Sequence, residues 1–412
     1  MEQDISVGLD IGTTKVCAIV ASPDENHPGK LKILGVGRSP SEGLTRGVVT
    51  NIDKTVKSIQ AAVADAEAQS GVHINSVTVG IAGDHIQSFQ SRGVIAISRP
   101  DNEITQEDVD RLIEDTKKVA LPLDRKIIHV IPQQFIVDGQ DGIYDPVGMS
   151  GVRMEAVVHI ITGLVTAAQN IYRCVQRAGL QVNDMVLEPL ASSYAVLEDE
   201  EKEVGVALLD IGGGTTDLAV FEERTIRHTA VIGIAGKKVT DDIRKGFGIL
   251  TDQAERIKQE HGFAYEPAVL DNQPITLPGI GGRPATEIDK MLLCKVIQPR
   301  MEEILEFAAL EIKRSGYSRH LSAGVVLTGG GSLIKGTAEL ASNVLGMPVK
   351  IGIPGGGSSG LVREIENPIY ATGVGLVMHE IKHRDRSTIT AALRDGKKGS
   401  VIRRMKEWFD QL

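Results

Sequence analysis

Cysteine is scarce in this sequence. Its 412 residues include three, and Cys17, Cys174 and Cys294 lie far apart in mostly apolar surroundings. No two of them form a CxxC pair, which argues against both a zinc site and a disulfide framework. We therefore expect three buried thiols in a reducing, cytosolic compartment.

Long apolar runs and secretion signals are also missing. No stretch of about 18 apolar residues occurs, as a membrane-spanning helix would need. The N-terminus, MEQDISVGLD, carries acids where a signal peptide carries Lys or Arg. The sequence therefore predicts a protein that is neither secreted nor membrane-spanning.

Positive charge is in the minority: 45 Lys and Arg stand against 54 Asp and Glu, a formal net charge of −9. This balance argues against a protein that coats nucleic acid. The charge is uneven, because residues 382–412 carry nine Lys or Arg and four acids. The length exceeds that of most single domains, so we expect two or more domains that share a cleft.

Strand-like and helical patterns alternate along the chain. Apolar, β-branched runs predict strands, and apolar residues at 3.6-residue spacing predict helices. Strands are expected at 7–10, 16–20, 76–81, 94–97, 126–131, 157–161, 204–210, 217–221 and 324–328. Helices are expected at 105–120, 166–179, 238–247 and 288–315, the last with a break at Pro299. The predicted fold class is α/β, with two similar halves.

One sequence pattern occurs twice, as VGLDIGTTKVCAIV at 7–20 and VALLDIGGGTTDLAV at 206–220. In each, a strand delivers an aspartate, Asp10 or Asp210, to a Gly-Thr turn that exposes backbone N–H groups. Two such turns predict a clamp on a polyphosphate, with both aspartates sharing a water-coordinated Mg²⁺. A duplicated hairpin without a ligand is the alternative. The residues assigned to the phosphates are Gly12, Thr13, Thr14 and Lys15 in the first turn and Gly212, Gly213, Gly214, Thr215 and Thr216 in the second.

A third glycine cluster, VVLTGGGSLIKG at 325–336, follows another apolar strand. Gly329, Gly330 and Gly331 are expected to precede a helix, where backbone amides suit phosphates and a flat glycine surface suits a purine ring. The spacing differs from GxGxxG, and no GK[ST] occurs in the chain. Neither a Rossmann nor a Walker nucleotide site is therefore indicated.

The order of these segments resembles the ATPase superfamily of actin, sugar kinases and heat-shock chaperones. The resemblance implies two domains that close on Mg·ATP, with weak or regulatory ATPase activity. It implies that EPLASSYAVL at 188–197 is a first connecting helix, in which Glu188 orients water, and that ENPIYATGVGL at 366–376 is a second. GIAGKKVTDDI at 233–243, with Gly236 and Lys237, resembles the segment that holds the ribose. A plain bend before an amphipathic helix is the alternative for that segment.

Within the superfamily the sequence resembles the FtsA family of bacterial cell division proteins over nearly its full length. GLTRGVVTNIDKTVKSIQAAVADAE at 43–67 and the insertion around HVIPQQFIVDGQDGIYDPVGMSG at 129–151 carry the resemblance, together with the C-terminal tail. The resemblance divides the chain into 1–84 with 164–196 and 370–380 as a first core subdomain, 85–163 as an inserted subdomain, 197–225 with 308–369 as a second core subdomain, 226–307 as a small subdomain, 381–399 as a flexible linker and 400–412 as an amphipathic helix.

The tail has chemistry that can be interpreted without the family. An apolar stripe at helical spacing lies beside cations, behind a charged and hydroxyl-rich segment, which is typical of a helix that lies in an anionic lipid interface. A C-terminal helix docked on the protein's own core is the alternative. The residues assigned to lipid are Val401, Ile402, Arg403, Arg404, Met405, Lys406, Trp408, Phe409 and Leu412.

FtsA-like identity implies partners and a location. The partners are the acidic C-terminal tail of FtsZ, other copies of the chain in a filament, other division proteins and anionic lipid, at the cytoplasmic face of the inner membrane at the septum. Lys290, Lys295 and Arg300 are the candidate contacts for the FtsZ tail. The competing interpretations are a PilM-like adaptor for pilus assembly and, on weaker grounds, a small-molecule kinase of the sugar-kinase class.

Overall fold

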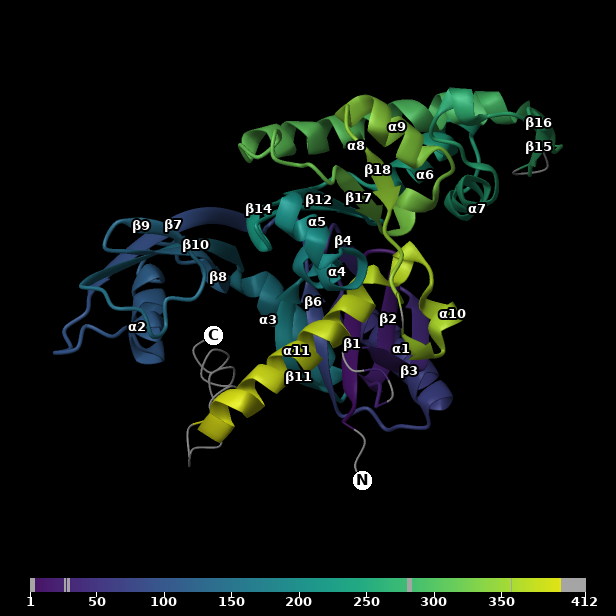
Figure 1. Ribbon diagram of the computed structural model, residues 1–412. Coiled ribbons are helices and arrows are strands. Elements are labelled where there is room, and N and C mark those ends of the chain that lie inside the picture. Colours follow the sequence, from purple (N-terminus) through teal and green to yellow (C-terminus); the bar gives the residue numbers. More distant parts are fainter. Residues whose placement is uncertain (1–3, 26, 28–29, 280–283, 357, 394–412) are drawn as a thin grey trace.

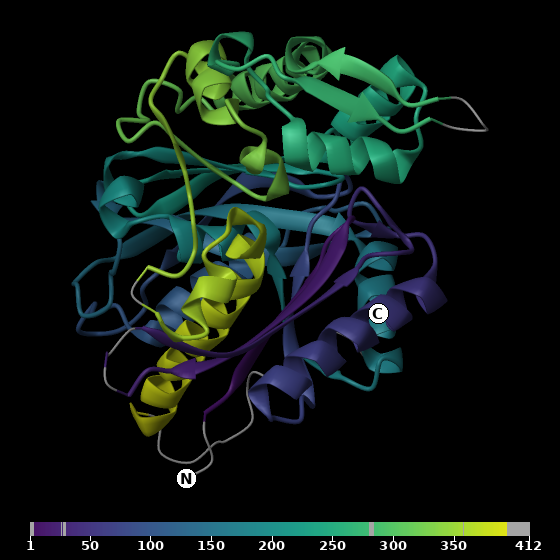
Figure 2. The same ribbon diagram turned by 90° about the vertical axis from the view of Figure 1, so that its right-hand side faces the viewer.

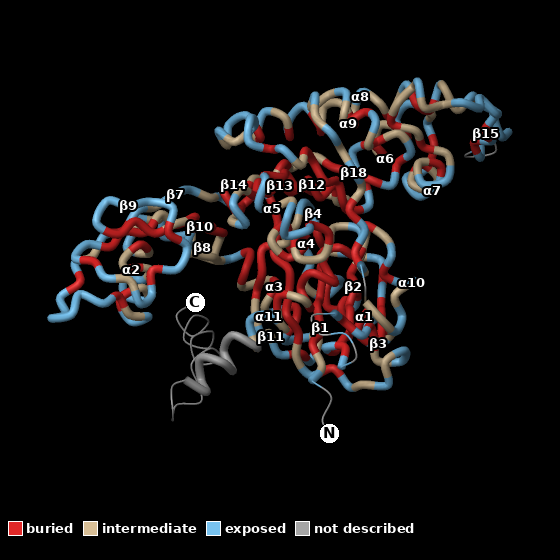
Figure 3. The backbone as a smooth tube through the Cα atoms, in the orientation of Figure 1, coloured by how far each residue is buried: buried red, intermediate tan, exposed pale blue. Residues whose placement is uncertain are grey.

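The structure is a computed structural model that describes residues 4–25, 27, 30–279, 284–356 and 358–393. Two halves of similar topology lie one above the other, and a third unit projects to the side (Figure 1). Buried residues concentrate in the strands of the two halves, and exposed residues lie on the helices and loops around them (Figure 3). The architecture is α/β, as the sequence predicts.

The first half is built on a six-stranded sheet. Three antiparallel strands, β3, β2 and β1, continue into two parallel strands, β6 and β11. In sheet order the strands are β11 (Gln181–Leu187), β6 (Ser76–Ile81), β1 (Ser6–Ile11), β2 (Lys15–Pro23), β3 (Leu31–Pro40) and β19 (Ser359–Gly360).

Helices cover both faces of this sheet, which explains why its strands are apolar without alternation. In β2, Val16, Ala18 and Val20 pack in one cluster with α1 (Ile52–Ser70) and α3 (Val165–Arg177). Their neighbours Cys17, Ile19 and Ala21 pack in another with α11 (Ala371–Leu393). Successive side chains of a strand point to opposite faces, so a strand buried on both faces is apolar throughout.

The second half repeats this sheet. Its five strands show the same succession of three antiparallel and two parallel neighbours. In sheet order they are β14 (Thr225–Ile232), β13 (Thr216–Glu222), β12 (Val206–Ile211), β17 (Val325–Thr328) and β18 (Val349–Ile351). One face packs against α6 (Gly236–Phe247), α8 (Lys290–Arg314) and α9 (Thr337–Leu345). The expectation of two similar halves agrees with this topology.

Two helices lie where the chain passes from one half to the other, and they cross each other there. They are α4 (Glu188–Val196), which follows β11, and α11, which lies along the first sheet (Figure 2). At their crossing a Cβ atom on Gly375 would lie 1.9 Å from the carbonyl oxygen of Ala191. Because a carbon atom cannot approach an oxygen so closely, the crossing requires glycine at this position.

The unit at the side is inserted between β6 and α3. Its four-stranded sheet has the order β7 (Gln87–Ala96), β10 (Arg153–Leu164), β8 (Arg125–Val137) and β9 (Gln140–Ile143). The helix α2 (Gln106–Thr116) packs on one face, where Leu112 joins a core with Met154 and Ile160.

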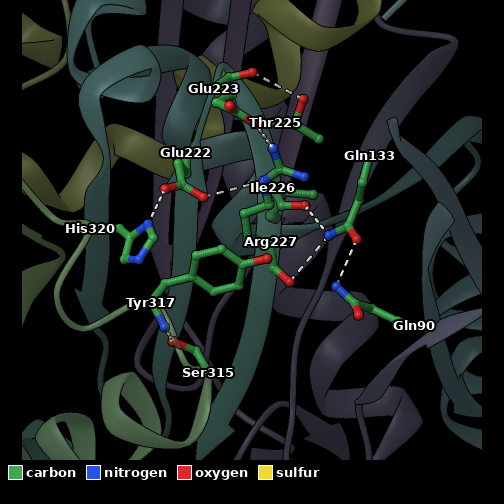
Figure 4. Close-up of polar contacts among 10 residues, drawn as sticks. All are labelled: Gln90, Gln133, Glu222, Glu223, Thr225, Ile226, Arg227, Ser315, Tyr317 and His320. Carbon is green, nitrogen blue, oxygen red and sulfur yellow. Dashed lines mark hydrogen bonds and ion pairs between the residues drawn. The ribbon is translucent and has the colours of Figure 1, made fainter. Parts of the chain in front are cut away.

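The inserted unit also contacts the edge strand of the second half. Gln133 lies at a bulge in β8 and donates from Nε2 to the carbonyl oxygens of Ile226 and Arg227 in β14, at 2.8 and 3.2 Å. Gln90 donates in turn to Oε1 of Gln133 at 2.8 Å (Figure 4). Further along β14, the side chains of Ser88 and His159 reach Thr229. Side chains from β7, β8 and β10 of the inserted unit thus contact β14, the edge strand of the second half.

Two predictions about helices are wrong. α8 runs unbroken through Pro299, because buried side chains on both sides of it, such as Ile297 and Met301, hold the helix in the core. The predicted linker at 381–399 is helical as far as Leu393, as the continuation of α11. The rest of that linker and the predicted membrane helix at 400–412 lie outside the described residues. The remaining elements are α5 (Asp199–Val204), α7 (Thr251–His261), α10 (Val362–Ile365), β4 (Leu44–Thr45), β5 (Val48–Val49), β15 (Pro274–Leu277), β16 (Thr286–Asp289) and the 3₁₀ turns η1 (Glu266–Ala268), η2 (Gly330–Leu333) and η3 (Pro368–Tyr370).

Candidate functional site

A cavity of about 800 Å³ lies between the two halves. Both glycine-threonine turns, the third glycine cluster and the first turn of α6 border it. The predicted residues that line it are Asp10, Gly12, Thr13, Thr14, Lys15, Glu188, Asp210, Gly212, Gly213, Gly214, Thr215, Gly236, Lys237, Gly329, Gly330 and Gly331. The structure therefore brings together segments that are far apart in the sequence.

The two hairpins are equivalent residue by residue. In the first, Asp10 lies opposite Cys17, and the pair of Ile11 with Val16 closes the turn. In the second, Asp210 lies opposite Asp217, and the pair of Ile211 with Thr216 closes the turn. Each aspartate is thus the last strand residue but one, which directs both aspartates to the same cavity.

The tips of the hairpins touch. A Cβ atom on Gly213 would lie 2.3 Å from Cγ2 of Thr14, and one on Gly214 would lie 2.4 Å from Oγ1 of Thr13. The second turn is closed by a bond from the N–H of Gly212 to the carbonyl oxygen of Thr215, at 2.9 Å. Glycine at 213 and 214 therefore lets one half approach the backbone of the other.

Acidic side chains gather at the base of the cavity around one cation. The Lys15 ammonium lies 2.8 Å from Oδ2 of Asp10. Burial alone would lower the pKa of Lys15, but Asp10 and the other anions nearby hold it above its usual value. Burial, together with Asp10, Asp217 and Asp210, raises the pKa of Glu188 well above its ordinary value. Glu188 therefore holds a proton more readily than an exposed glutamate does.

Asp210 and Asp217 also resist ionisation. Burial raises the pKa of Asp210 to about 6, against a hydrogen bond from Ser192 that lowers it. Burial and the charge of Asp210 raise the pKa of Asp217. Thr215 donates to Oδ2 of Asp217 at 3.0 Å. The other oxygen of Asp217, Oδ1, is buried without a partner among the described residues. Four acids share one lysine, so the base of the cavity favours an added cation.

The other end of the cavity is held by α6 and α7. The N–H groups of Gly236 and Lys237 donate to the carbonyl oxygens of Gly212 and Gly213, at 3.1 and 2.9 Å. Lys258 of α7 donates to the carbonyl oxygen of Gly236 at 3.2 Å and to Oε2 of Glu255 at 2.7 Å. The segment at 233–243, which is predicted to hold the ribose, is thus joined to the second hairpin by hydrogen bonds.

One predicted ligand is wrong, and several cavity residues were missed. Thr216 is fully buried and does not border the cavity, because it is the first residue of β13 and donates from Oγ1 to the carbonyl oxygen of Ile234 at 2.8 Å. Asp217, Glu255 and Lys258 line the cavity without having been predicted. The repeated pattern could have revealed Asp217, because the second hairpin carries this acid where the first hairpin carries Cys17. An acid and a lysine three residues apart on α7 are ordinary for a helix.

The three predicted partner cations do not form one patch. Lys290, Lys295 and Arg300 are five residues apart on α8, which turns successive members by about 140° around the helix axis. Lys290 pairs with Asp271 at 3.6 Å, and Arg300 with Asp242 at 2.6 Å. Lys295 is exposed. The residues assigned to lipid, from Val401 to Leu412, lie outside the described residues.

Two wider expectations can be compared with the described part of the chain. All three cysteines are free and buried. No helix among the described residues is long and apolar enough to span a membrane.

The cavity fits a polyphosphate that arrives with a divalent cation. Glycine turns from both halves leave the backbone open to phosphate oxygens, and the excess of carboxylates would repel a phosphate that came alone. Among the described residues, no group of three His, Cys, Asp or Glu side chains is placed to hold a metal ion directly. Mg²⁺ usually keeps several waters and takes one or two carboxylates, and Asp10 and Asp210, from opposite hairpins, are the residues that could supply them.

Two sheets of the same topology, crossed by α4 and α11 around a cavity between paired hairpins, define an actin-like protein with an inserted subdomain. Comparison with known sequences gives the family. A profile described as "Cell division protein FtsA" matches residues 207–375, and one described as "SHS2 domain inserted in FTSA" matches 83–162. The chain belongs to the FtsA family of cell division proteins.

Individual relatives support this assignment. The chain is 44% identical to the cell division protein FtsA of Pseudomonas aeruginosa, over 98% of this chain and 96% of that protein. It is 39% identical to the FtsA of Escherichia coli K12, over 99% and 98%.

Solved structures agree on the fold. The chain is similar to the "PilM-PilN type IV pilus biogenesis complex", with a TM-score of 0.67, 16% identity and coverage of 91% of this chain and 98% of that one. It is also similar to MreB5 of Spiroplasma citri bound to AMPPNP, with a TM-score of 0.57, 14% identity and coverage of 95% and 100%.

Proposed function

We propose that this division protein binds Mg·ATP between its two hairpins and uses the nucleotide to govern a membrane-attached filament. The observation that carries the proposal is the equivalence of the hairpins, which presents Asp10 and Asp210 to one cavity. The similarity in fold to MreB5, whose crystal structure was solved bound to AMPPNP, supports a nucleotide as the ligand.

In this proposal each residue has a definite role. The turns 12–15 and 212–215 receive the phosphates through backbone N–H groups, and Lys15 neutralises part of their charge. Asp10 and Asp210 would hold Mg²⁺, and the bound cation would neutralise charge between the phosphates and the carboxylates. Glu188 would place water in its ionised form, which its burial and acidic neighbours disfavour and a bound cation would favour. Slow or regulatory hydrolysis is expected from this requirement.

Calorimetry tests the nucleotide proposal. Asp210→Ala should weaken Mg·ATP binding by about tenfold or more, because one carboxylate of the cation site is lost. Asp141→Ala, an exposed aspartate in the inserted subdomain, is the matched control and should bind as the parent chain does. Equal affinity of the parent and Asp210→Ala for Mg·ATP would refute the assignment.

We further propose that residues 400–412 attach the protein to the inner face of the cytoplasmic membrane and so tether a filament of FtsZ at the division site. The stripe of bulky side chains beside Arg403, Arg404 and Lys406 supports lipid binding. Anionic lipid contributes only about 1 kcal/mol per cation, so a single helix binds weakly. Polymerised copies would bind together through avidity.

Liposome sedimentation tests the membrane proposal. Trp408→Glu puts a carboxylate into the apolar stripe near anionic lipid, so the protein should stay in the supernatant. Because Trp408 is the one tryptophan of the sequence, its emission should shift to the blue when the parent chain binds anionic vesicles. Sedimentation without any such shift would mean that another part of the chain is the anchor.

Docking of the FtsZ tail can be tested at one position of α8. Lys295 is exposed, whereas Asp242 already holds Arg300. Lys295→Glu should weaken binding of an FtsZ tail peptide, and Arg300→Glu should instead destabilise the fold. If Lys295→Glu binds the peptide unchanged, the tail docks elsewhere.

A further inference from the structure

Two buried hydroxyls from different helices converge on one oxygen of Asp210. Ser192 of α4 is fully buried and donates from Oγ to Oδ2 of Asp210 at 2.9 Å. Thr372, in the first turn of α11, reaches the same oxygen from Oγ1 at 3.4 Å. The two hydroxyl oxygens lie 3.0 Å apart. Three chain segments that are distant in sequence thus meet at a single carboxylate.

The orientation of Ser192 is unusual for a serine inside a helix. Such a serine commonly donates back to a carbonyl of the preceding turn. The neighbouring Ser193 does so, since its Oγ donates to the carbonyl oxygen of Leu190 at 2.7 Å. Ser192 instead reaches out of its own helix to another strand. This hydrogen bond therefore does not stabilise α4 itself. It joins α4 to β12.

The same place is the crossing of the two helices that join the halves. Ala191, next to Ser192, accepts the close approach of Gly375, one turn after Thr372. Asp210 belongs to the second hairpin; α11 packs along the first sheet, and α4 packs against strands of both sheets.

Both hydrogen bonds use Oδ2, which fixes the plane of the carboxylate. The other oxygen, Oδ1, lies beside Gly329, where a Cβ atom would come within 2.2 Å of it. Asp210 as a whole lines the cavity. Two donors on one oxygen and glycine beside the other leave the carboxylate a single direction in which to present its charge.

We propose that Ser192 and Thr372 are positioning residues that aim Asp210 at the cation. The inference rests on the proposed binding of Mg·ATP. Side chains that orient a metal-binding group typically change metal affinity by about 10- to 100-fold without touching the metal. The nucleotide itself would be held by the turns and would not need these hydroxyls.

The test separates nucleotide binding from its dependence on the cation. ATP affinity is measured by calorimetry with Mg²⁺ and with a chelator, for the parent chain, Ser192→Ala, Thr372→Val and the control Ser193→Ala. In Ser192→Ala and Thr372→Val the gain in ATP affinity from Mg²⁺ should fall about tenfold or more, whereas the ATP affinity measured with the chelator should not change. Ser193→Ala should keep the full gain. Thr372→Ser retains the hydroxyl and should keep it too.

The outcomes are distinguishable. If the parent chain gains no affinity from Mg²⁺, the proposed function fails at its cation site. If the parent gains affinity and Ser192→Ala and Thr372→Val gain as much, the positioning role is wrong. A general loss of ATP affinity with and without Mg²⁺, or a melting temperature far below that of Ser193→Ala, would mean that the hydroxyls act on the fold alone.

A second variant pair tests whether the hydroxyls act through Asp210. In Asp210→Asn the gain from Mg²⁺ should be small, and adding Ser192→Ala should reduce it no further. Additive losses in the double variant would overturn the inference, because independent effects add whereas effects through one group do not.

Discussion

Asp217 lies directly opposite Asp210 on the β12–β13 ladder, at the position that Cys17 takes opposite Asp10 in the first hairpin. The two halves are therefore equivalent in backbone and unequal in charge. The second hairpin presents two carboxylates side by side in a buried place, which is unfavourable for the protein without a ligand. A bound cation would relieve that repulsion.

Asp217→Asn should stabilise the protein without ligand by about 1 kcal/mol or more while weakening Mg·ATP binding. Burial and Asp210 raise the pKa of Asp217, so the folded chain holds a proton that the unfolded chain releases above pH ~4. The contribution of Asp217 to the free energy of unfolding should therefore fall as pH rises from about 5 to 8, and the advantage of Asp217→Asn over the parent chain should grow. Denaturant melts at several pH values measure this. An advantage that shrinks with rising pH would contradict the assignment.

Gly213→Ala should impair closure of the two hairpins. The new methyl group would occupy the position of the Thr14 side chain, so the tips must separate. ATP affinity should fall by about tenfold or more while each half keeps its fold. Gly356→Ala, where the added methyl group meets nothing within 4 Å, is the control. In a double-mutant cycle Thr14→Ala should recover part of the loss, and strict additivity would mean that the two side chains do not meet.

Gln133→Ala should loosen the inserted subdomain from β14. Gln133 is 1% exposed and its amide serves two carbonyl oxygens, so removal leaves buried acceptors without a donor. A loss of about 1–3 kcal/mol in the free energy of unfolding is expected. Hydrogen exchange should accelerate in β14 and in residues 87–91. Gln134→Ala, at the neighbouring position of β8, should change both far less.

Acid should destabilise the protein through His159. Burial lowers the pKa of His159 to about 4, and its Nε2 lies 3.0 Å from Oγ1 of Thr229. The unfolded chain takes up this proton below pH ~6.5 and the folded chain does not until about 4, so stability is lost as pH falls through that window. The expected contribution is about 3 kcal/mol. His159→Gln should flatten the profile between these values.

The hairpins could be predicted from sequence because their signal is local and repeated. Each strand, turn and strand lies within a short stretch of the chain, and the second copy repeats the first. Thr216 was misassigned because one residue decides where a turn ends and a strand begins, and the pattern of Gly and Thr does not mark that boundary. Its equivalent in the first hairpin, Val16, is plainly a strand residue.

Contacts over long separations could not be predicted in this way. Ser192 and Thr372 lie 180 positions apart, and only the crossing of α4 and α11 brings both to Asp210. The three cations of α8 illustrate the converse. They are close in sequence, but a five-residue spacing spreads them around the helix, and acids of this chain hold two of them. Pro299 does not break α8 because packing on that helix outweighs the loss of one hydrogen bond.

The edge strand β14 is in contact with two parts of the molecule at once. Its C-terminal end leads into residues 233–236, whose Gly236 is bonded to the turn at Gly212, and its middle is held by Gln133 and His159 of the inserted subdomain. We therefore expect that a protein that displaced the inserted subdomain would also move the loops around the cavity. By reciprocity, a ligand in the cavity would then alter how strongly such a protein binds the inserted subdomain. Information about the occupancy of the cavity would then reach the division machinery through a strand that never touches the ligand.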